Sequence, residues 1–241
     1  MEEDSDATAS DIEQEPPVEP KNPLETRIPV LLMTDDKYDT RKEYDEDKHY
    51  VNTKVAEYAK HMLLLYPNAR MYILDDVTEN TCKYFHRVGI PKWLIYAPNY
   101  NMLSAMWLGA QSELAYWYAM WWNEFIVYQS KPPLNRPEVS LVWFDAMNTL
   151  RMMKEDIDSI FQHTNFVDGA YLVLTVNKRD NKQRKLTAIE EKICARYATK
   201  DGYVILSVTI NTIAKKYGYK LHCLWDHTYA MYAVAWRVTK L

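Results

Sequence analysis

The sequence predicts an α/β fold: a doubly wound, mostly parallel sheet that closes with a C-terminal antiparallel hairpin. Short apolar runs such as EVSLVWFD (138–145) alternate with longer segments of helical spacing, and parallel strands need such crossovers on the faces of the sheet. Two strand-like runs follow each other directly in 219–240, which favours a hairpin. A chain of 241 residues with 48% hydrophobic content buries one core, so we expect a single domain over 27–241.

The first half of this domain begins with RIPVLLMT (27–34), which is a strand or an extended arm. Apolar residues then recur at helical spacing over 48–67, and Pro67 stops that helix. The elements expected next are a strand at 70–76, a helix from Thr78, a strand at 92–99, an aromatic helix over about 101–122 and a strand at 124–130 (EFIVYQS).

The second half continues the alternation. The expected elements are a strand at 138–145, a helix at 154–164, a strand at 169–177 and a helix at 185–199. The segment 203–218 allows two interpretations, because its β-branched residues favour a strand whereas its length and Gly218 favour a helix. The hairpin is expected to turn around 226–228.

The N-terminal segment, residues 1–26, is predicted to be a disordered acidic tail. Residues 1–24 hold eight acids, one lysine and four prolines, with few large apolar side chains. Their formal charge of −7 leaves +3 for the rest of a chain whose total is −4. The tail is either a solubilising segment or an interaction segment that competes for a basic groove.

Several classes of protein are disfavoured by what the sequence lacks. No run reaches the roughly 18 apolar residues of a membrane-spanning helix, and the acidic start is unlike a secretory signal. Cys82, Cys194 and Cys223 lie far apart, which predicts reduced thiols, a cytoplasmic or nuclear protein and no metal site. With five glycines and dispersed histidines, neither a phosphate-binding loop nor a GxSxG nucleophile motif is present.

Polar residues follow several of the predicted strands. Asp75 and Asp76 end the first strand, Asn99 the second, Asp145 the fourth and Asn177 the fifth. Ligands of doubly wound sheets bind beyond the carboxyl ends of the strands. These residues therefore mark the candidate site.

These strand ends and the closing hairpin resemble the class I S-adenosylmethionine-dependent methyltransferase fold over about residues 50–241. The similarity is to divergent methyltransferase-like proteins, some from large DNA viruses and eukaryotic microbes. The family motif D-x-G-x-G-x-G falls on Asp75, Val77, Glu79 and Thr81, so only its acid is retained. Glycines in this corner let the backbone approach a ligand, so Val77 and Glu79 push a cofactor outward unless the loop takes another course.

The resemblance implies S-adenosyl-L-methionine as the cofactor, with no metal. The residues expected to bind it are Asp75, Asp76, Thr78, Thr81 and Asn99. The two acids attract a cationic sulfur, the hydroxyls bond a ligand, and Asn99 replaces the acid that the family uses for the ribose. The alternative is that both acids only cap the following helix.

Asp145 stands where the resemblance places the methyl donor against the acceptor, and it is the expected catalytic residue. A base-methylating enzyme typically has an Asn/Asp-Pro-Pro-aromatic motif there, whereas the sequence here is FDAMNT, which argues against N6-adenine methylation. A ribose methyltransferase requires a Lys-Asp-Lys-Glu tetrad; Asp145 and Lys178 could supply two of its members, but the sequence shows no convincing remainder. In the simpler interpretation, Asn148 and Thr149 cap the next helix.

A basic run follows the fifth strand. Its cations are Lys178, Arg179, Lys182, Arg184 and Lys185. They form either a positive surface that binds RNA or DNA phosphates through counterion release, or a solvated loop. The aromatic stretch 106–122 is likewise either core or a surface for a protein partner.

Two functions remain open. The first is an S-adenosylmethionine-dependent methyltransferase that acts on nucleic acid, which the acids kept at the strand ends favour. The second is a non-catalytic protein of the same fold that serves as a nucleic-acid-binding or structural subunit, which the loss of the glycines favours. The sequence leans slightly to the first.

Overall fold

A computed structural model describes residues 42–134, 136–146, 150–177, 191–192, 202–228 and 231–241. Several predictions fall outside the described residues: the acidic tail, the run 27–34, Asn148 and Thr149, the basic run, and the helix at 185–199 apart from 191–192. These remain predictions.

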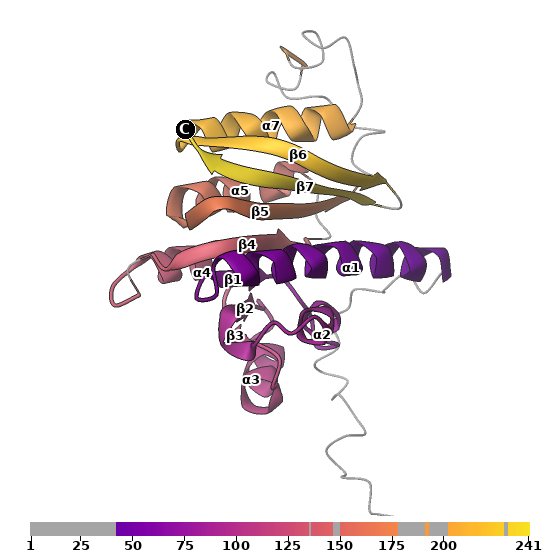
Figure 1. The fold of residues 1–241 in the computed structure, drawn as a ribbon, viewed down its shortest axis with the longest axis vertical. Coiled ribbons are helices and arrows are strands. Elements are labelled where there is room, and N and C mark those ends of the chain that lie inside the picture. Colours follow the sequence, from indigo (N-terminus) through magenta and orange to yellow (C-terminus); the bar gives the residue numbers. More distant parts are fainter. Residues whose placement is uncertain (1–41, 135, 147–149, 178–190, 193–201, 229–230) are drawn as a thin grey trace, which may run out of the picture.

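A seven-stranded sheet organises the fold (Figure 1). Its strands are β1 (Arg70–Ile73), β2 (Ile95–Pro98), β3 (Tyr116–Tyr118), β4 (Glu138–Phe144), β5 (Asn165–Asn177), β6 (Tyr219–Thr228) and β7 (Met231–Lys240). They lie in the order β3-β2-β1-β4-β5-β7-β6. The pairs from β3 to β5 are parallel, whereas β7 is antiparallel to both β5 and β6. The predicted fold class, a mostly parallel sheet with a C-terminal antiparallel hairpin, is confirmed.

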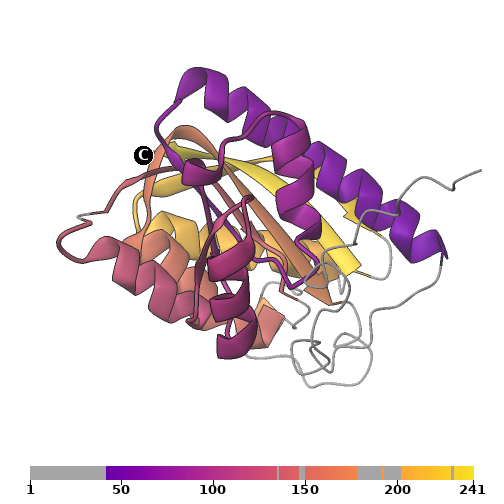
Figure 2. The same cartoon turned by 90° about the horizontal axis from the view of Figure 1, so that it is seen from below.

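Helices cover both faces of the sheet, as Figure 2 shows. They are α1 (Lys42–Leu65), α2 (Asn80–Arg87), α3 (Met102–Gln111), α4 (Trp122–Ser130), α5 (Leu150–His163) and α7 (Gly202–Lys216), with a short 3-10 helix η2 (Lys92–Leu94) before β2. Helix α1 packs against α2 and β4, and α5 packs between α4 and α7. Two adjacent residues of β4 mark the two faces, because Trp143 stacks on Phe85 of α2 while Phe144 stacks on Trp122 of α4.

The core lies between the sheet and both helix layers. Trp143 and Trp236 are the largest fully buried side chains. Helix α1 contributes a buried stripe, as predicted from its spacing: Val51, Val55, Ala59 and Met62. This stripe fixes the orientation of α1 on the sheet.

Two predictions for 101–130 are wrong. The expected aromatic helix over 101–122 is divided, because α3 ends at Gln111 and β3 then pairs with β2 at the edge of the sheet. The expected strand at 124–130 is part of helix α4. The buried residues of α4 recur at helical spacing and so explain its conformation: Trp122, Phe125, Ile126 and Gln129.

The segment 203–218, which the sequence left open, is helix α7 followed by a turn. Gly218 ends that turn with φ of +80°, a left-handed conformation that glycine adopts without a Cβ clash. Among the helices that the structure describes, none is long and apolar enough to cross a membrane.

Candidate functional site

The carboxyl ends of β1, β2, β4, β5 and β6 lie along one edge of the sheet, since β6 is antiparallel to β7 and therefore runs in the direction of β5. We call this side of the sheet, where the strands end, the carboxyl edge; it differs from the lateral edges, which are the outermost strands β3 and β6. The N-terminal part of α1 extends past it in Figure 1. Asp75, Asp76, Asn99 and Asp145 all follow strands at the carboxyl edge, so the structure places the predicted site residues on the same side of the molecule.

The Asp75 carboxylate joins the end of β1 to the start of α2. Its Oδ2 accepts a hydrogen bond from the Cys82 backbone N–H at 2.9 Å, and its Oδ1 accepts one from the Asp76 N–H at 2.9 Å. Burial raises the pKa of Asp75 to about 6, although these hydrogen bonds and the charge of Lys48 oppose the shift. Asp75 thus caps α2 and also places a titratable group at the carboxyl edge.

Asp76 closes the turn that follows. Its Oδ1 accepts hydrogen bonds from the backbone N–H of Thr78 at 2.8 Å and from the Thr78 hydroxyl at 2.5 Å. Thr81 is buried in the first turn of α2. The structure therefore gathers Asp75, Asp76, Thr78 and Thr81 in one corner, where side-chain hydrogen bonds order a loop that contains no glycine.

This loop keeps one backbone conformation that is typical of glycine. Glu79, which stands at a glycine position of the D-x-G-x-G-x-G motif, has φ of 52° and ψ of 33°, in the left-handed region. Its carboxylate accepts a hydrogen bond from the Ser112 hydroxyl, just beyond α3. The Val77 side chain packs against Leu108 of α3. Both bulky side chains therefore contact the α3 region.

Asn99 ties the loop after β2 to the loop after β1. It is buried, with 5% of its surface exposed. Its Nδ2 donates to the Asp75 carbonyl oxygen at 3.4 Å, and its Oδ1 accepts from the Asn101 N–H at 2.8 Å. Asn99 therefore lies next to Asp75, and its amide connects the two loops.

Asp145 forms an ion pair with Lys48 of α1, a residue that the sequence analysis did not identify. The Lys48 ammonium donates to Asp145 Oδ2 and lies 5.8 Å from the centre of the Trp143 ring. The other oxygen, Oδ1, is buried and has no hydrogen-bond partner among the described residues. No spacing rule connects Lys48 with Asp145 in the sequence, because the two are 97 positions apart.

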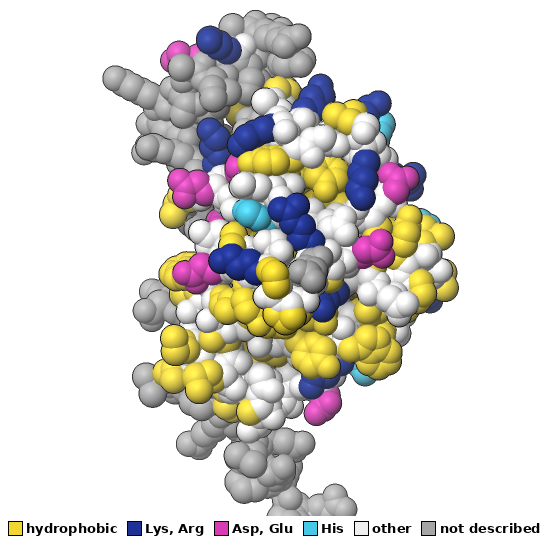
Figure 3. Space-filling model, turned by 90° about the vertical axis from the view of Figure 1, so that its left-hand side faces the viewer, with side chains coloured by type: hydrophobic (Ala, Val, Ile, Leu, Met, Phe, Trp, Pro, Cys, Tyr) yellow, Lys and Arg dark blue, Asp and Glu magenta, His cyan; other side chains and the backbone are white. Residues whose placement is uncertain are grey.

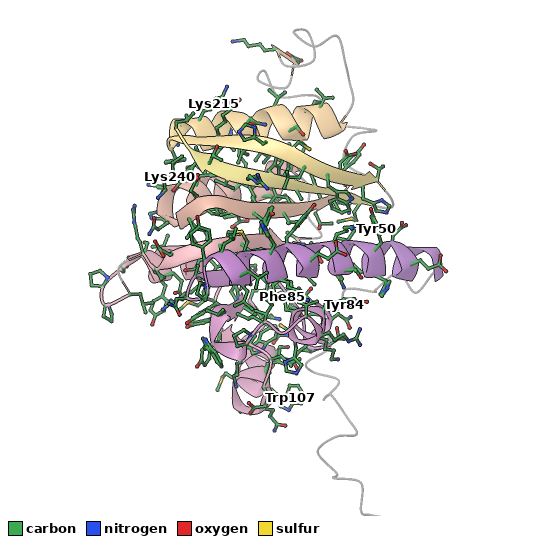
Figure 4. All side chains as sticks on the ribbon, in the orientation of Figure 1. Tyr50, Tyr84, Phe85, Trp107, Lys215 and Lys240 are labelled. Carbon is green, nitrogen blue, oxygen red and sulfur yellow. The ribbon has the colours of Figure 1, made fainter. Side chains whose placement is uncertain are left out.

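One turn of α1, residues 47–50, connects separate elements of the carboxyl edge. Each of its side chains contacts a residue that is distant in the sequence: Asp47 contacts His227, Lys48 contacts Asp145, His49 contacts Tyr84, and Tyr50 contacts Trp225. Figure 4 labels Tyr50 near the β6–β7 end and Tyr84 on α2. The start of α1 is therefore a structural part of the candidate site.

This arrangement has a defined chemistry. Asp75 and Asp145 supply two carboxyl groups, and Lys48 interacts with both. A ligand hydroxyl or amine can donate a hydrogen bond to Asp145 Oδ1. Within the described part of the chain, no group of histidine, cysteine, aspartate and glutamate side chains could hold a metal ion.

The predicted basic run begins directly after Asn177, the last residue of β5 at the carboxyl edge. Its five cations lie outside the described residues. On the opposite edge, which faces the viewer in Figure 3, lysine and arginine side chains are scattered among hydrophobic ones. That edge offers exposed cations for control substitutions.

The aromatic stretch 106–122 is partly core and partly surface. Leu108 and Trp122 are buried, whereas Met106 and Trp121 are 63% and 59% exposed. The Trp121 ring stacks on Tyr100, with ring centres 4.8 Å apart and planes 11° apart. A protein partner for this exposed part remains a prediction.

Comparison with known proteins shows similarity in structure alone. No model of a known protein family matches the sequence, and no curated protein matches it. Trm1 from Pyrococcus horikoshii, solved with S-adenosyl-L-methionine, aligns with a TM-score of 0.57 and 9% identity over 83% of this chain and 56% of Trm1. HI0767 from Haemophilus influenzae, assigned as a methylase, aligns with a TM-score of 0.48 and 12% identity over 79% of this chain and 99% of its own.

The N-methyltransferase NodS from Bradyrhizobium japonicum, in complex with S-adenosyl-L-homocysteine, aligns with a TM-score of 0.46 and 12% identity over 86% of this chain and 93% of NodS. Of these three structures, Trm1 alone exceeds a TM-score of 0.5. Its similarity agrees with the strand order and the closing hairpin described above. This chain therefore has the class I methyltransferase-like fold.

Proposed function

We propose that this protein is an S-adenosylmethionine-dependent methyltransferase that acts on nucleic acid. The observation that carries the proposal is the buried Oδ1 of Asp145, which lacks a hydrogen-bond partner among the described residues. A buried acceptor of this kind is costly unless a ligand or water satisfies it. Asp145 contacts Lys48, whose charge also acts on Asp75. The corner that we propose for the methyl donor is therefore next to Asp145, which we propose contacts the methyl acceptor.

The cofactor corner consists of Asp75, Asp76, Thr78, Thr81 and Asn99. S-adenosylmethionine supplies, when bound, a methyl group on a cationic sulfur. In our proposal, the Asp75 and Asp76 carboxylates favour that positive charge, and Asn99 orients the loop that faces the ribose. The side chains of Glu79 and Val77 contact the α3 region.

Asp145 is the proposed catalytic residue, and Lys48 is the residue that positions it. Lys48 holds Oδ2, which leaves Oδ1 to accept a hydrogen bond from the acceptor group and to orient it or take its proton. In our proposal, Lys48, Asp145 and Lys178, the residue that follows β5 in the sequence, take three positions of the Lys-Asp-Lys-Glu tetrad of ribose methyltransferases. We assign no glutamate to the fourth position. This arrangement favours a ribose hydroxyl as the acceptor.

The nucleic-acid part of the proposal rests on the basic run, which the sequence places directly after β5 at the carboxyl edge. Lys178, Arg179, Lys182, Arg184 and Lys185 are its proposed phosphate contacts. An intracellular location is part of the same proposal, and neither Cys82 nor Cys223 forms a disulfide bond with a described residue.

A second candidate function is a non-catalytic, nucleic-acid-binding or structural subunit with this fold. The observation that favours it is that the side chains of Asp75, Asp76 and Asn99 all form hydrogen bonds with other residues of the protein. Such bonds order the loops whether or not a cofactor is present. Both functions share the nucleic-acid surface and differ in cofactor binding and transfer.

A transfer assay tests the proposed function. The full chain is incubated with S-adenosylmethionine that carries a labelled methyl group, in parallel with single-stranded RNA, RNA with 2′-O-methylated riboses, and DNA. Label is expected on the unmodified RNA alone, to be lost in Asp145→Asn and reduced in Lys48→Met. Lys60→Met, a variant of an exposed lysine on the same helix, is the control and retains transfer. Absence of label with every substrate favours the non-catalytic function.

A further inference from the structure

Three aromatic side chains form a cluster at the carboxyl end of β6. The Trp225 and His227 rings lie nearly parallel, with planes 8° apart and centres 6.0 Å apart. Tyr50 of α1 contacts both, with ring centres 5.8 Å from Trp225 and 5.0 Å from His227. Tyr50 is 41% exposed, and the other two rings are partly exposed. We call these three residues the aromatic platform.

A β-bulge at Leu224 determines the direction of the platform. Pairing between β6 and β7 is regular up to Cys223 and Trp236, then shifts so that Trp225 pairs with Ala235 and Leu224 is left as the extra residue. In a strand, alternate side chains share a face. The bulge therefore moves Trp225 and His227 onto the face that α1 covers, and bulges beside functional sites commonly re-aim side chains in this way.

Polar contacts hold the platform in place. Asp47 Oδ1 lies 2.7 Å from His227 Nε2, and the Trp225 indole N–H donates to the Tyr50 hydroxyl at 3.3 Å. The rings are thereby fixed at their edges, whereas a flat ligand approaches rings over their faces. A preordered surface loses little side-chain entropy when it binds.

The platform lies on the same edge as the proposed catalytic residue. Asp47 and Tyr50 belong to the same turn of α1 as Lys48, which pairs with Asp145. In the sheet, β6 is separated from β4 by β5 and β7, which is three strand spacings, or roughly 14 Å. A group on the platform is therefore a neighbour of the group at Asp145 and not the same group.

We propose that Tyr50, Trp225 and His227 stack a nucleobase of a single-stranded nucleic acid, next to the nucleotide held at Asp145. The inference rests on the proposed function, which makes nucleic acid the substrate, and it adds how that substrate is recognised. Bases of any identity stack on aromatic rings, and a base inside a duplex has no free face for a platform. The occupant is single-stranded RNA or DNA with little sequence preference.

Binding of labelled 12-nucleotide strands, measured by fluorescence anisotropy without cofactor, tests the platform. Trp225→Leu and Tyr50→Leu are each expected to weaken binding about tenfold, because each removes one base–aromatic stack. Trp225→Phe keeps a ring and retains most of the affinity. Trp93→Ala is the control, since Trp93 is 61% exposed but lies before β2, away from the carboxyl edge. The thermal midpoint of each variant shows that it is folded.

A second comparison uses the ligand. A strand with abasic sites at all central positions should bind the wild-type protein about tenfold more weakly, and should bind wild type and Trp225→Leu alike. Binding that is unchanged in both Trp225→Leu and Tyr50→Leu overturns the platform. The platform is also overturned if Tyr100→Leu or Trp121→Leu weakens binding instead of those two variants. If strands bind through Trp225 but no label is transferred, the platform stands and the proposed catalysis fails. If the cofactor binds but no strand binds, the platform proposal is refuted while cofactor binding stands.

Discussion

Lys48 and Asp145 form an ion pair between the first described helix and the end of β4, and both side chains are largely buried. The pair fixes the start of α1 over the carboxyl edge and leaves Asp145 Oδ1 as an unsatisfied acceptor among the described residues. The same lysine therefore holds the start of α1 in place and contacts the carboxylate that we propose as catalytic.

The stability losses caused by replacing Lys48 and Asp145 should not be additive. Lys48→Met leaves the Asp145 charge largely buried without its partner, which costs about 1–3 kcal/mol in a pair that water still reaches. The double variant Lys48→Met/Asp145→Asn should lose less than the sum of the single variants, with a coupling of about 1 kcal/mol or more. Urea unfolding measures all four proteins, and Lys60→Met, at an exposed position of α1, serves as the control. Additive single effects would show that the pair contributes nothing.

At position 79, the glycine variant should be more stable than the alanine variant. Both substitutions lose the hydrogen bond from Ser112, but only glycine relieves the left-handed backbone, so Glu79→Gly should be more stable than Glu79→Ala by about 1 kcal/mol. Lys83 provides the control, because it lies within α2 and its Gly variant should be less stable than its Ala variant by about 1 kcal/mol. The same sign at both positions, in thermal unfolding, would contradict the left-handed conformation of Glu79.

Stability should fall as the pH rises from about 4 to above 6. Burial raises the pKa of Asp75 from 3.8 to about 6, and burial followed by the charge of Glu155 raises that of Asp156 to about 6. In this window the unfolded chain releases both protons first, so the free energy of unfolding decreases with pH and levels off above the folded pKa. Asp75→Asn and Asp156→Asn should each remove part of this decrease. Urea titrations at several pH values test this, and an unchanged slope in both variants would refute it.

The basic run should govern the salt dependence of nucleic-acid binding. Replacing Lys178, Arg179, Lys182 and Lys185 by alanine should weaken binding to all strands alike. The plot of log K against log salt should flatten by about 0.7 for each phosphate that the variant no longer neutralises. The control has the same charge change at the opposite edge: Lys131, Lys215, Lys220 and Lys240 replaced by alanine.

Deleting residues 1–24 should strengthen binding at low salt if the acidic tail competes for the same surface. If the slope of log K against log salt is unchanged by the four alanine substitutions in the basic run, the phosphate-binding surface lies elsewhere.

Much of the fold could be predicted from the sequence because local patterns determine it. The buried stripe of α1, the apolar strand β4 and the two adjoining strands of the hairpin are all visible as periodicity. The strand β3 was missed because it is only three residues long and consists of tyrosine and tryptophan within an aromatic stretch. Helix α4 was missed because its helical spacing begins at Trp122, whereas the run EFIVYQS (124–130) taken alone has the length and composition of a strand.

The candidate site was predictable only where strand ends mark it. Asp75, Asn99 and Asp145 follow strands, and parallel topology brings them to one edge. Lys48 and the aromatic platform were not predicted, because their contacts join segments far apart in the chain and depend on the placement of α1. The bulge at Leu224 is likewise set by the pairing of β6 with β7 and has no local sequence mark.

Calorimetric titration with S-adenosyl-L-homocysteine tests the central claim, that the corner around Asp75 binds the cofactor. The wild-type protein should give a saturable heat, and ligand at about 100 times Kd should stabilise the fold by about 2.7 kcal/mol. Asp75→Ala/Asp76→Ala should weaken binding, whereas Glu138→Ala/Asp168→Ala, which removes two exposed acids near the amino ends of β4 and β5, should not. No heat and no shift of the thermal midpoint at saturating ligand would contradict the account.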